Sequence, residues 1–256
     1  MTRMSRLSVV SLILLLSLPT AAKAGGYDWT GMYIGLNSGV VFGKGHTDVT
    51  VPNEAGSYFG PTSVASIDGI GERKLEDLGY TGGVQAGFDQ QLGPVVFGLV
   101  TDFDRFDLND SDHVLQTYPC CGPSAYQIQN TLETDWLFTL RGRLGFALDR
   151  LLVFGSGGIA VTDLKEHFEF TDDFGPAQES GFIRAARIGW TVGGGLEFAI
   201  FDHVSVSAEY LHLDFRRKSR VENDFLDNGV LNTSTHMKHS IDLESEIGRV
   251  AVNFRF

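Results

Sequence analysis

Charged residues of both signs alternate with apolar residues in several segments of the chain. Arg141 and Arg143 lie two positions apart in such a segment, and so do Asp102 and Asp104. Side chains two positions apart in a β-strand point to the same face of the sheet. A charge buried on that face must be paired, because an isolated one costs several kcal/mol. The pattern predicts an internal network of ion pairs, whose predicted members are Asp102, Asp104, Arg141, Arg143, Arg187, Glu197, Glu209 and Arg249.

Histidines offer a second kind of chemistry. Those in or beside the segments without strand patterning are His46, His113, His167, His236 and His239. A histidine near Tyr58, Tyr118 or Tyr126 could ligate haem iron. Their spacing matches no metal site, and solvated loop histidines are commoner. The sequence therefore predicts no metal site and leaves haemin binding as an alternative.

The sequence offers little for catalysis. His239 and Ser240 are neighbours, but adjacent residues of a strand point to opposite faces and do not readily form a nucleophile–base pair. A Gly-x-Ser-x-Gly elbow is absent from the sequence. We therefore expect that the protein is not an enzyme.

The two cysteines, Cys120 and Cys121, are adjacent in a Pro-Cys-Cys-Gly-Pro turn. An oxidising compartment permits a disulfide, but neighbouring cysteines bridge only with strain, because the usual Cα separation exceeds one peptide step. The sequence favours a simple loop pair over a redox role and leaves the state of the two thiols open.

Eight segments are predicted to be β-strands, and all but the Gly-rich, apolar segment 152–161, whose facing is left open, alternate apolar and polar residues with the period of a strand. They are 33–42, 80–89, 95–104, 136–146, 152–161, 187–198, 204–210 and 250–256. In the segment 136–146, for example, Phe138, Leu140 and Leu144 oppose Arg141 and Arg143. Arg255 lies on the polar face of the last segment, with Arg249.

The connections between these segments differ in length. Tight connections lie at 91–94, 147–151 and 199–203, whereas the stretches 43–78, 106–131, 162–186 and 215–239 are long and are predicted to be loops. Short turns at one end, long loops at the other and an even strand count are typical of outer-membrane barrels. The sequence therefore predicts an all-β fold, an eight-stranded antiparallel up-and-down transmembrane barrel with four long surface loops and short periplasmic turns.

The width of such a barrel bears on the predicted charge network. An interior ringed by eight strands is just wide enough for side chains to fill. The charges could line a selective channel or form a salt-bridged plug, and the width favours the plug. The aromatic residues Trp29, Tyr33, Trp136, Trp190 and Tyr210 are predicted to form girdles at the membrane interfaces.

The first residues have the pattern of a secretory signal. Arg3 and Arg6 precede an apolar run over 7–18, and Ala22-Lys23-Ala24 offers a cleavage site. The run is too short to span a membrane as a helix. We expect residues 1–24 to be a cleaved signal peptide and residues 25–256 to be the barrel domain.

The formal net charge of −12 argues against a nucleic-acid partner, which needs a basic surface. An acidic surface is compatible with cation-bridged contacts to lipopolysaccharide.

Several segments resemble small alpha-proteobacterial outer-membrane proteins of the porin-family or OmpA-like β-barrel group. They are Tyr27-Asp28-Trp29-Thr30-Gly31, Arg141-Gly142-Arg143-Leu144-Gly145-Phe146, the stretch 189–198 and Val252-Asn253-Phe254-Arg255-Phe256. The resemblance implies a surface barrel of the cell outer membrane with a structural, envelope-integrity and surface-interaction role and no catalysis. The alternative is a small-solute porin or a haemin-binding protein, because some members are linked to haemin.

The resemblance also implies partners. These are outer-membrane lipid and lipopolysaccharide, the barrel-assembly machinery and host surface molecules. The last strand looks like the signal that the assembly machinery reads, with Phe254 and Phe256 as its aromatic positions.

Overall fold

A computed structural model describes residues 26–52, 57–221 and 225–256. The predicted signal peptide, residues 1–24, lies outside this part of the chain and stays a prediction. The long strands are β1 (Gly31–Thr50), β2 (Arg73–Leu92), β3 (Val95–Thr117), β4 (Ala125–Leu148), β5 (Leu151–Asp172), β6 (Ala177–Ala199), β7 (Val204–Val221) and β10 (Lys238–Arg255). Three short elements complete the described chain: α1 (Pro61–Gly71), β8 (Leu226–Asp227) and β9 (Val230–Leu231).

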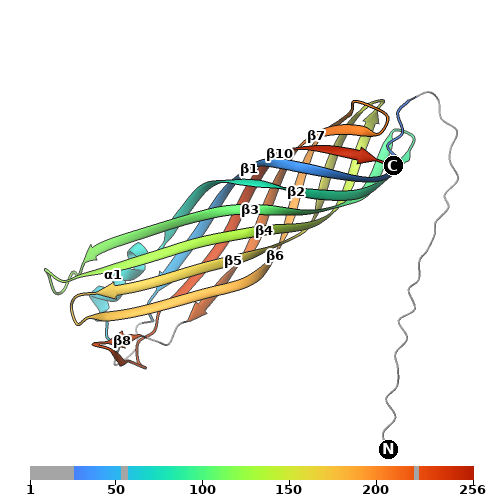
Figure 1. Cartoon of the computed structure of the whole chain (residues 1–256). Coiled ribbons are helices and arrows are strands. Elements are labelled where there is room, and N and C mark those ends of the chain that lie inside the picture. The colour runs from blue at the N-terminus through green and yellow to red at the C-terminus, as the bar shows by residue number, and fades with distance from the viewer. Residues whose placement is uncertain (1–25, 53–56, 222–224) are drawn as a thin grey trace, which may run out of the picture.

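The eight long strands close into a barrel (Figure 1). Each pairs antiparallel with the strand that follows it, from β1 to β7, and β10 pairs with both β7 and β1. Followed once around the ring, the register that starts at Tyr33 returns to β1 at Gly43. The strands are therefore tilted and staggered, as a closed barrel requires. No helix in the described residues is long and apolar enough to cross a membrane.

The predicted long loops are the main error of the sequence analysis. The stretches 43–78, 106–131, 162–186 and 215–239 are largely strand, because β1 to β7 and β10 continue through them. The connections at this end shrink to 51–72, which holds α1, then 118–124, 173–176 and 222–237, which holds β8 and β9. The tight connections were predicted correctly and lie at 93–94, 149–150 and 200–203. We call the end with these turns the turn end and the opposite end the distal end.

The outward face of the barrel is predominantly apolar in the part next to the turn end. On β3 the outward side chains Val95, Phe97, Leu99 and Phe103 are exposed, each by 39% or more. Equivalent outward residues on the other strands include Leu36, Leu144, Ile188 and Val252. A strand of about 9–11 residues is enough to cross the hydrocarbon layer of a membrane. We call this ring of exposed apolar side chains around the barrel the apolar band.

Beyond the apolar band the polarity of the wall is reversed. The next outward residues on β3 are Arg105 and Asp107, whereas the inward Phe106 and Leu108 are buried. On β5, Asp163 and Lys165 are outward and Leu164 is inward. The distal part of the barrel thus resembles a water-soluble protein, with an apolar inside and a polar outside.

Two apolar clusters fill this distal part. The upper core, next to the apolar band, includes Phe106, Leu137, Leu213, Phe215 and Ile247. The cap core, at the distal end, includes Ile67, Tyr126, Phe168, Phe170 and Phe225. The helix α1 contributes Val64 and Ile67 to the cap core, which explains why this connection folds over the barrel mouth.

A hydrogen-bonded acid joins the elements of the cap. Asp172 accepts hydrogen bonds from the hydroxyls of Tyr58 at 3.0 Å and Tyr118 at 2.7 Å. Burial, together with the bond to Asp172, raises the pKa of both phenols, so they remain protonated donors at neutral pH. The cap is therefore held by polar bonds as well as by apolar packing.

The wall has two seams in its described part, where neighbouring strands separate. β2 pairs with β3 only from Tyr80 to Leu92, so 73–79 of β2 and 108–117 of β3 do not pair with each other. The second seam lies between β6 and β7. β6 pairs with β7 from Gly189 to Ala199 and with β8 only at Ala177 and Gln178. Between these points β6 pairs with β5 alone, while β7 continues along β10 past an irregularity at Ile241. Both seams begin at the distal edge of the apolar band, where water can satisfy the backbone groups that lipid could not.

The extended strands make a prediction about proteolysis. Protease added to intact cells is expected to cut within the connections 118–124 or 173–176. It is not expected to cut within 106–117 or 162–172, because the backbone there is hydrogen-bonded in strands. Mass spectrometry of the released peptides checks this. Early cuts spread across 106–117 would favour the loop prediction over the strands.

Candidate functional site

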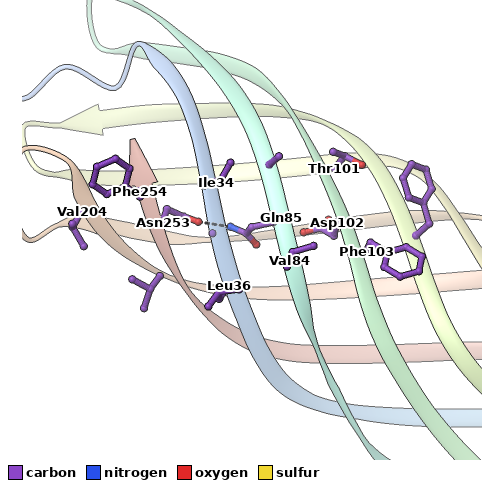
Figure 2. Close-up of a pocket in the computed structure, with 14 residues that line it drawn as sticks. Ile34, Leu36, Val84, Gln85, Thr101, Asp102, Phe103, Val204, Asn253 and Phe254 are labelled. Carbon is purple, nitrogen blue, oxygen red and sulfur yellow. Dashed lines mark hydrogen bonds between the residues drawn. The ribbon is translucent and has the colours of Figure 1, made fainter. Parts of the chain in front are cut away.

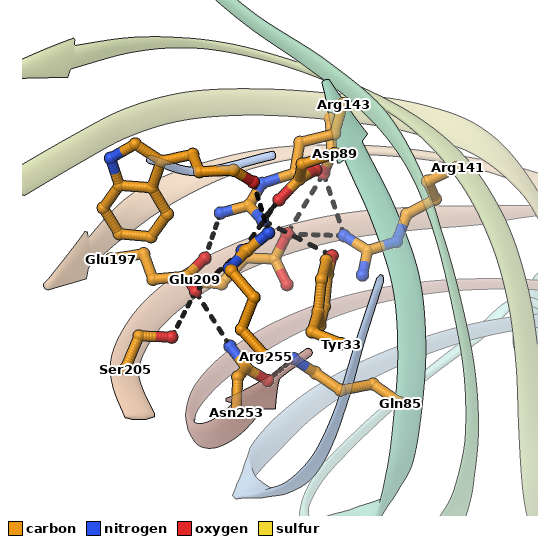
Figure 3. Close-up of polar contacts among 12 residues, drawn as sticks. Tyr33, Gln85, Asp89, Arg141, Arg143, Glu197, Ser205, Glu209, Asn253 and Arg255 are labelled. Atoms are coloured by element: carbon orange, nitrogen blue, oxygen red, sulfur yellow. Dashed lines mark hydrogen bonds and ion pairs between the residues drawn. The ribbon is translucent and has the colours of Figure 1, made fainter. Parts of the chain in front are cut away.

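Paired charges fill the lumen at the level of the apolar band, in two layers. The layer next to the turn end, which we call the turn-side layer, consists of Arg143, Arg255, Asp89 and Glu197 (Figure 3). Asp89 Oδ2 lies 3.1 Å from Arg143 Nη1 and 3.0 Å from Arg255 Nη2. Arg143 Nη2 also binds Glu197, and Arg255 Nη2 lies 3.7 Å from Glu197 Oε1. Two arginines and two acids thus form a closed, charge-balanced ring.

Neighbouring groups hold this layer in place. Glu197 accepts hydrogen bonds from Ser205 Oγ at 2.5 Å and Asn253 Nδ2 at 3.2 Å. The guanidinium of Arg143 lies 3.9 Å from the ring centre of Phe154. The guanidinium of Arg255 lies 4.9 Å from the ring centre of Tyr33. Hydrogen bonds and cation–π contacts of this kind stabilise desolvated cations.

The second layer, which we call the central layer, lies closer to the upper core. It consists of Arg141, Arg249, Asp102, Asp104 and Glu209. Arg141 binds Asp102 at 2.8 Å and Glu209 at 2.5 Å, and Arg249 binds the same two acids at 2.8 Å and 2.7 Å. Arg249 Nη1 also lies 3.2 Å from Asp104 Oδ2. Every acid of this layer therefore contacts at least one guanidinium.

Polar side chains complete the central layer. Thr139 donates a hydrogen bond to Asp102, and Arg141 Nη1 donates one to Ser156 Oγ at 2.8 Å. Asn37 Nδ2 donates one to Asp104 at 2.8 Å. Buried ion pairs offset their desolvation only when the remaining polar atoms are satisfied in this way.

The two layers leave almost no free space at this level. A cavity of about 10 Å³ lies between them, bordered by Tyr33, Gln85, Arg141 and Arg143 among others. Such a volume holds about one water molecule. Beyond the central layer the upper core fills the lumen with apolar side chains. The arrangement can carry charge pairing and rigidity.

All eight residues of the predicted network are on the inner face of the barrel, but they form more than one group. Five belong to the central layer, and Arg143 and Glu197 belong to the turn-side layer. Arg187 lies apart from both, next to the upper core. Within the described part of the chain, its Nε and Nη2 atoms have no hydrogen-bond partner.

Sequence reasoning missed Asp89 as a network member and misplaced two aromatic residues. Trp29 and Tyr33 were predicted at the membrane interface, but they are 0% and 2% exposed and pack inside the turn end. Tyr33 lies an even number of residues from the inward Asn37 on β1, so the alternation of this strand already indicated that Tyr33 points inward. Trp190 and Tyr210 do face outward, at the distal edge of the apolar band.

The distal edge of the band carries paired charges and polar aromatics, which we call the rim. Arg105 lies 3.2 Å from Asp107, and Lys165 Nζ lies 2.5 Å from Asp135. Indole Nε1 of Trp190 donates to Asp214 at 3.0 Å, Tyr210 donates to Glu246, and His212 Nδ1 lies 3.1 Å from that carboxylate. Aromatic side chains with one polar end are typical of a membrane–water interface.

Phe254 and Phe256 lie at the turn end of the outward face. Phe254 stands in register between Ile34 of β1 and Val204 of β7, and its ring centre is 5.1 Å from that of Phe256. The backbone N–H of Phe256 donates to the carbonyl of Met32 at 2.9 Å. Their role in recognition by the assembly machinery stays a prediction.

The histidines do not gather into a metal site. Among the described residues, no group of three or more His, Cys, Asp or Glu could hold a metal ion. His46 lies 3.2 Å from Glu72. His239 stacks on Phe168 inside the lumen, 3.6 Å from Glu166.

A broad hollow of about 720 Å³ lies on the outer side of β1, β2, β3 and β10 (Figure 2). Its apolar wall includes the outward Ile34, Leu36, Val84, Phe103 and Val252. These residues belong to the apolar band, and the hollow also borders Gln85, Asp102 and Asn253.

Comparison with known proteins agrees with this architecture. A family model described as outer membrane protein beta-barrel domain matches residues 8–236. The 31 kDa outer-membrane immunogenic protein of Brucella melitensis biotype 1 is 31% identical over 243 residues, which cover 94% of this chain and 89% of that protein. The chain belongs to the outer membrane protein β-barrel family.

Other similar proteins have more distant sequences. The 22 kDa outer membrane protein of Rhizobium leguminosarum bv. viciae is 25% identical over 163 residues, covering 64% of this chain and 65% of that protein. The solved structure of OprG from Pseudomonas aeruginosa is 10% identical, covering 90% of this chain and 98% of that chain, with a TM-score of 0.47.

Membership of the outer membrane protein β-barrel family gives the apolar band its environment. The protein is an outer-membrane protein, and the band is the part of its wall that faces lipid. Both charged layers lie at the level of this band, whereas the upper core continues beyond its distal edge.

Proposed function

We propose that this protein is a structural barrel of the outer membrane with a closed lumen and no catalytic role. The observation that carries the proposal is the filling of the lumen at membrane level. Arg141 and Arg249 bridge the same two acids, and Arg143 and Arg255 share Asp89. These pairs tie strands on opposite sides of the barrel together, which suits a rigid envelope protein better than a solute pathway.

We infer that the rim contacts lipopolysaccharide. Arg105 and Lys165 stand at the edge of the apolar band, where the phosphates of an outer leaflet would lie, and the acids beside them suit divalent cations. This orientation places the turn end toward the periplasm and the distal barrel outside the cell, as in other barrels of this kind. In this orientation the polar distal wall is the surface that faces host molecules. Contact with such molecules stays a prediction.

The alternatives have less support. A small-solute porin needs a continuous water path, and the two layers and the upper core obstruct one. Haemin binding needs an iron ligand beside an apolar slot, and no described feature of the structure favours it. We therefore propose neither.

The envelope role is tested by deletion and complementation. Cells that lack the protein are expected to be more sensitive to anionic detergents, and the wild-type chain is expected to restore resistance. A variant with Arg105→Ala and Lys165→Ala is expected to restore it only in part, because it weakens the rim. Leu115→Ala, outward on β3 but distal to the rim, serves as the control and is expected to restore it fully. An unchanged sensitivity of the deletion strain would contradict the envelope role.

A further inference from the structure

The distal tip of the barrel carries a disulfide that the proposed structural role does not use. Cys120 and Cys121, adjacent in the chain, are bonded to each other in the connection between β3 and β4. The turn around them is tight, because Tyr118 N–H donates to the carbonyl of Ser124 at 2.9 Å and Ser124 N–H donates to that of Cys121 at 3.1 Å. Sequence reasoning left the state of these cysteines open, and the structure joins them.

The two sulfurs have different surroundings. Cys120 is exposed, whereas Cys121 is half-buried and packs against the cap core. Sγ of Cys120 lies 3.6 Å from Oγ of Ser63. Ser63 is in the first turn of α1, and Gly60 at the N-cap supplies no side-chain bond to that turn. The first turn also contains no acidic residue.

This contact favours negative charge on one sulfur. The first N–H groups of a helix have no partner within the helix, and they carry its partial positive charge. With neither an acid nor a capping side chain to neutralise that charge, α1 stabilises a thiolate that forms beside it. The hydroxyl of Ser63 can donate to the same sulfur. Cys120 is therefore the better leaving group of the two cysteines.

We propose that Cys120–Cys121 is a thiol–disulfide exchange site that reacts with small thiols outside the cell. A thiolate attacks Sγ of Cys121, forms a mixed disulfide with it and releases Cys120 as a thiolate. A second small thiolate then attacks the outer sulfur of the mixed disulfide and releases Cys121 as a thiolate. Two small thiols are thereby oxidised to one disulfide, and the Cys120–Cys121 bond is reduced to two thiols. The exposed tip admits the reagent, and the barrel wall takes no part.

The first test uses the full chain in isolated outer membranes. Oxidised protein is treated briefly with reduced glutathione, quenched with iodoacetamide and digested for mass spectrometry. We expect glutathione on Cys121 and the alkyl group on Cys120. Glutathione on Cys120, an even distribution over both cysteines, or an intact Cys120–Cys121 bond at glutathione concentrations that reduce an exposed peptide disulfide would each overturn the proposal.

The second test isolates the effect of the helix. The Cys121→Ser variant retains Cys120, and the Cys120→Ser variant retains Cys121. At neutral pH we expect Cys120 to react with iodoacetamide at least about threefold faster than Cys121. A thiolate fraction about tenfold larger speeds the reaction of Cys120, and the lower intrinsic nucleophilicity of its thiolate reduces that gain to about threefold. Equal rates would contradict the assignment of Cys120 as the leaving group.

Two further variants separate the contact from the helix as a whole. In the Cys121→Ser background, Ser63→Ala is expected to slow the reaction of Cys120. Ser66→Ala in the same helix, whose hydroxyl bonds Tyr126 at 2.9 Å, is expected to leave it unchanged. Migration of boiled and unboiled samples on a denaturing gel verifies that each variant has a folded barrel. Equal slowing by both substitutions in folded protein would mean that the contact with Ser63 has no specific role.

Discussion

Replacement of Arg249 by alanine is expected to lower the free energy of unfolding by about 3–5 kcal/mol, the usual cost of removing one partner from a buried ion pair. Arg249 contacts Asp102, Asp104 and Glu209, and its side chain is 2% exposed. Without it, Asp102 and Glu209 keep only the guanidinium of Arg141, and Asp104 loses its guanidinium contact, in a region with almost no room for water. Urea unfolding of the barrel in lipid vesicles, followed by tryptophan fluorescence, measures the change.

Two matched variants make this result interpretable. Arg105→Ala removes a guanidinium that pairs with Asp107 at the rim, where the two side chains are 61% and 49% exposed. An exposed pair of this kind contributes about 0–1 kcal/mol, so this variant should unfold nearly as the wild type does. Arg249→Lys keeps the charge but loses the planar fork, and we expect an intermediate loss. Equal stabilities of Arg249→Ala and Arg105→Ala would refute the central layer as a stabilising network.

The second large effect is expected at Phe106, which lies in a stretch that the sequence analysis assigned to a loop. Phe106 is 0% exposed and belongs to the upper core together with Leu137 and Phe215. Phe106→Ala is expected to lower the free energy of unfolding by about 3–5 kcal/mol, the cost of truncating a buried phenylalanine. The same urea titration in vesicles measures it.

Leu115→Ala is the control for Phe106, because both residues are in β3 and Leu115 is 70% exposed. A surface substitution of this kind usually changes stability by less than about 0.5 kcal/mol. If Phe106→Ala were as mild as Leu115→Ala, the distal part of the barrel would not have a packed core, and the original loop assignment would stand.

The alternation of side chains explains how much of the fold was predictable. In 95–104 and 136–146 the polar residues identified the inner face and the apolar residues identified the lipid-facing one, because successive residues of a strand point to opposite faces. This rule gave the order of the strands and the tight turns at 93–94 and 149–150. It also gave the inward facing of Arg141 and Arg143, and both residues are buried in the structure.

The sequence analysis made the strands too short because the polarity of the outward and inward positions reverses along them. Between Val95 and Phe103 the outward positions of β3 are apolar except for Thr101, but Arg105, Asp107 and Asn109 are polar outward residues and the inward Phe106 and Leu108 are apolar. Phe106 and Leu108 still alternate with Asp107 and Asn109, so the period continues. A search for lipid-facing strands stops where the outward face becomes polar, although the hydrogen-bonded sheet does not.

The partners within the network could not be predicted from facing alone. Alternation gives the side of the wall, but the stagger of the whole barrel decides which strands meet across the lumen. Asp89 therefore pairs with Arg143 and Arg255, which are far from it in the sequence. The same stagger leaves Arg187 beside the upper core, away from both layers, although its side chain faces the lumen as the side chains of the two layers do.

Single-channel recording in planar bilayers tests the closed lumen most directly. Full-length protein purified from outer membranes is inserted into a bilayer and held at a series of voltages, beside a general porin as the positive control. The structure predicts no steady open conductance, because paired charges and then apolar side chains fill the lumen from the turn end to the cap. A large, steady, ion-selective conductance from the wild-type protein would contradict the closed lumen and would restore the porin alternative.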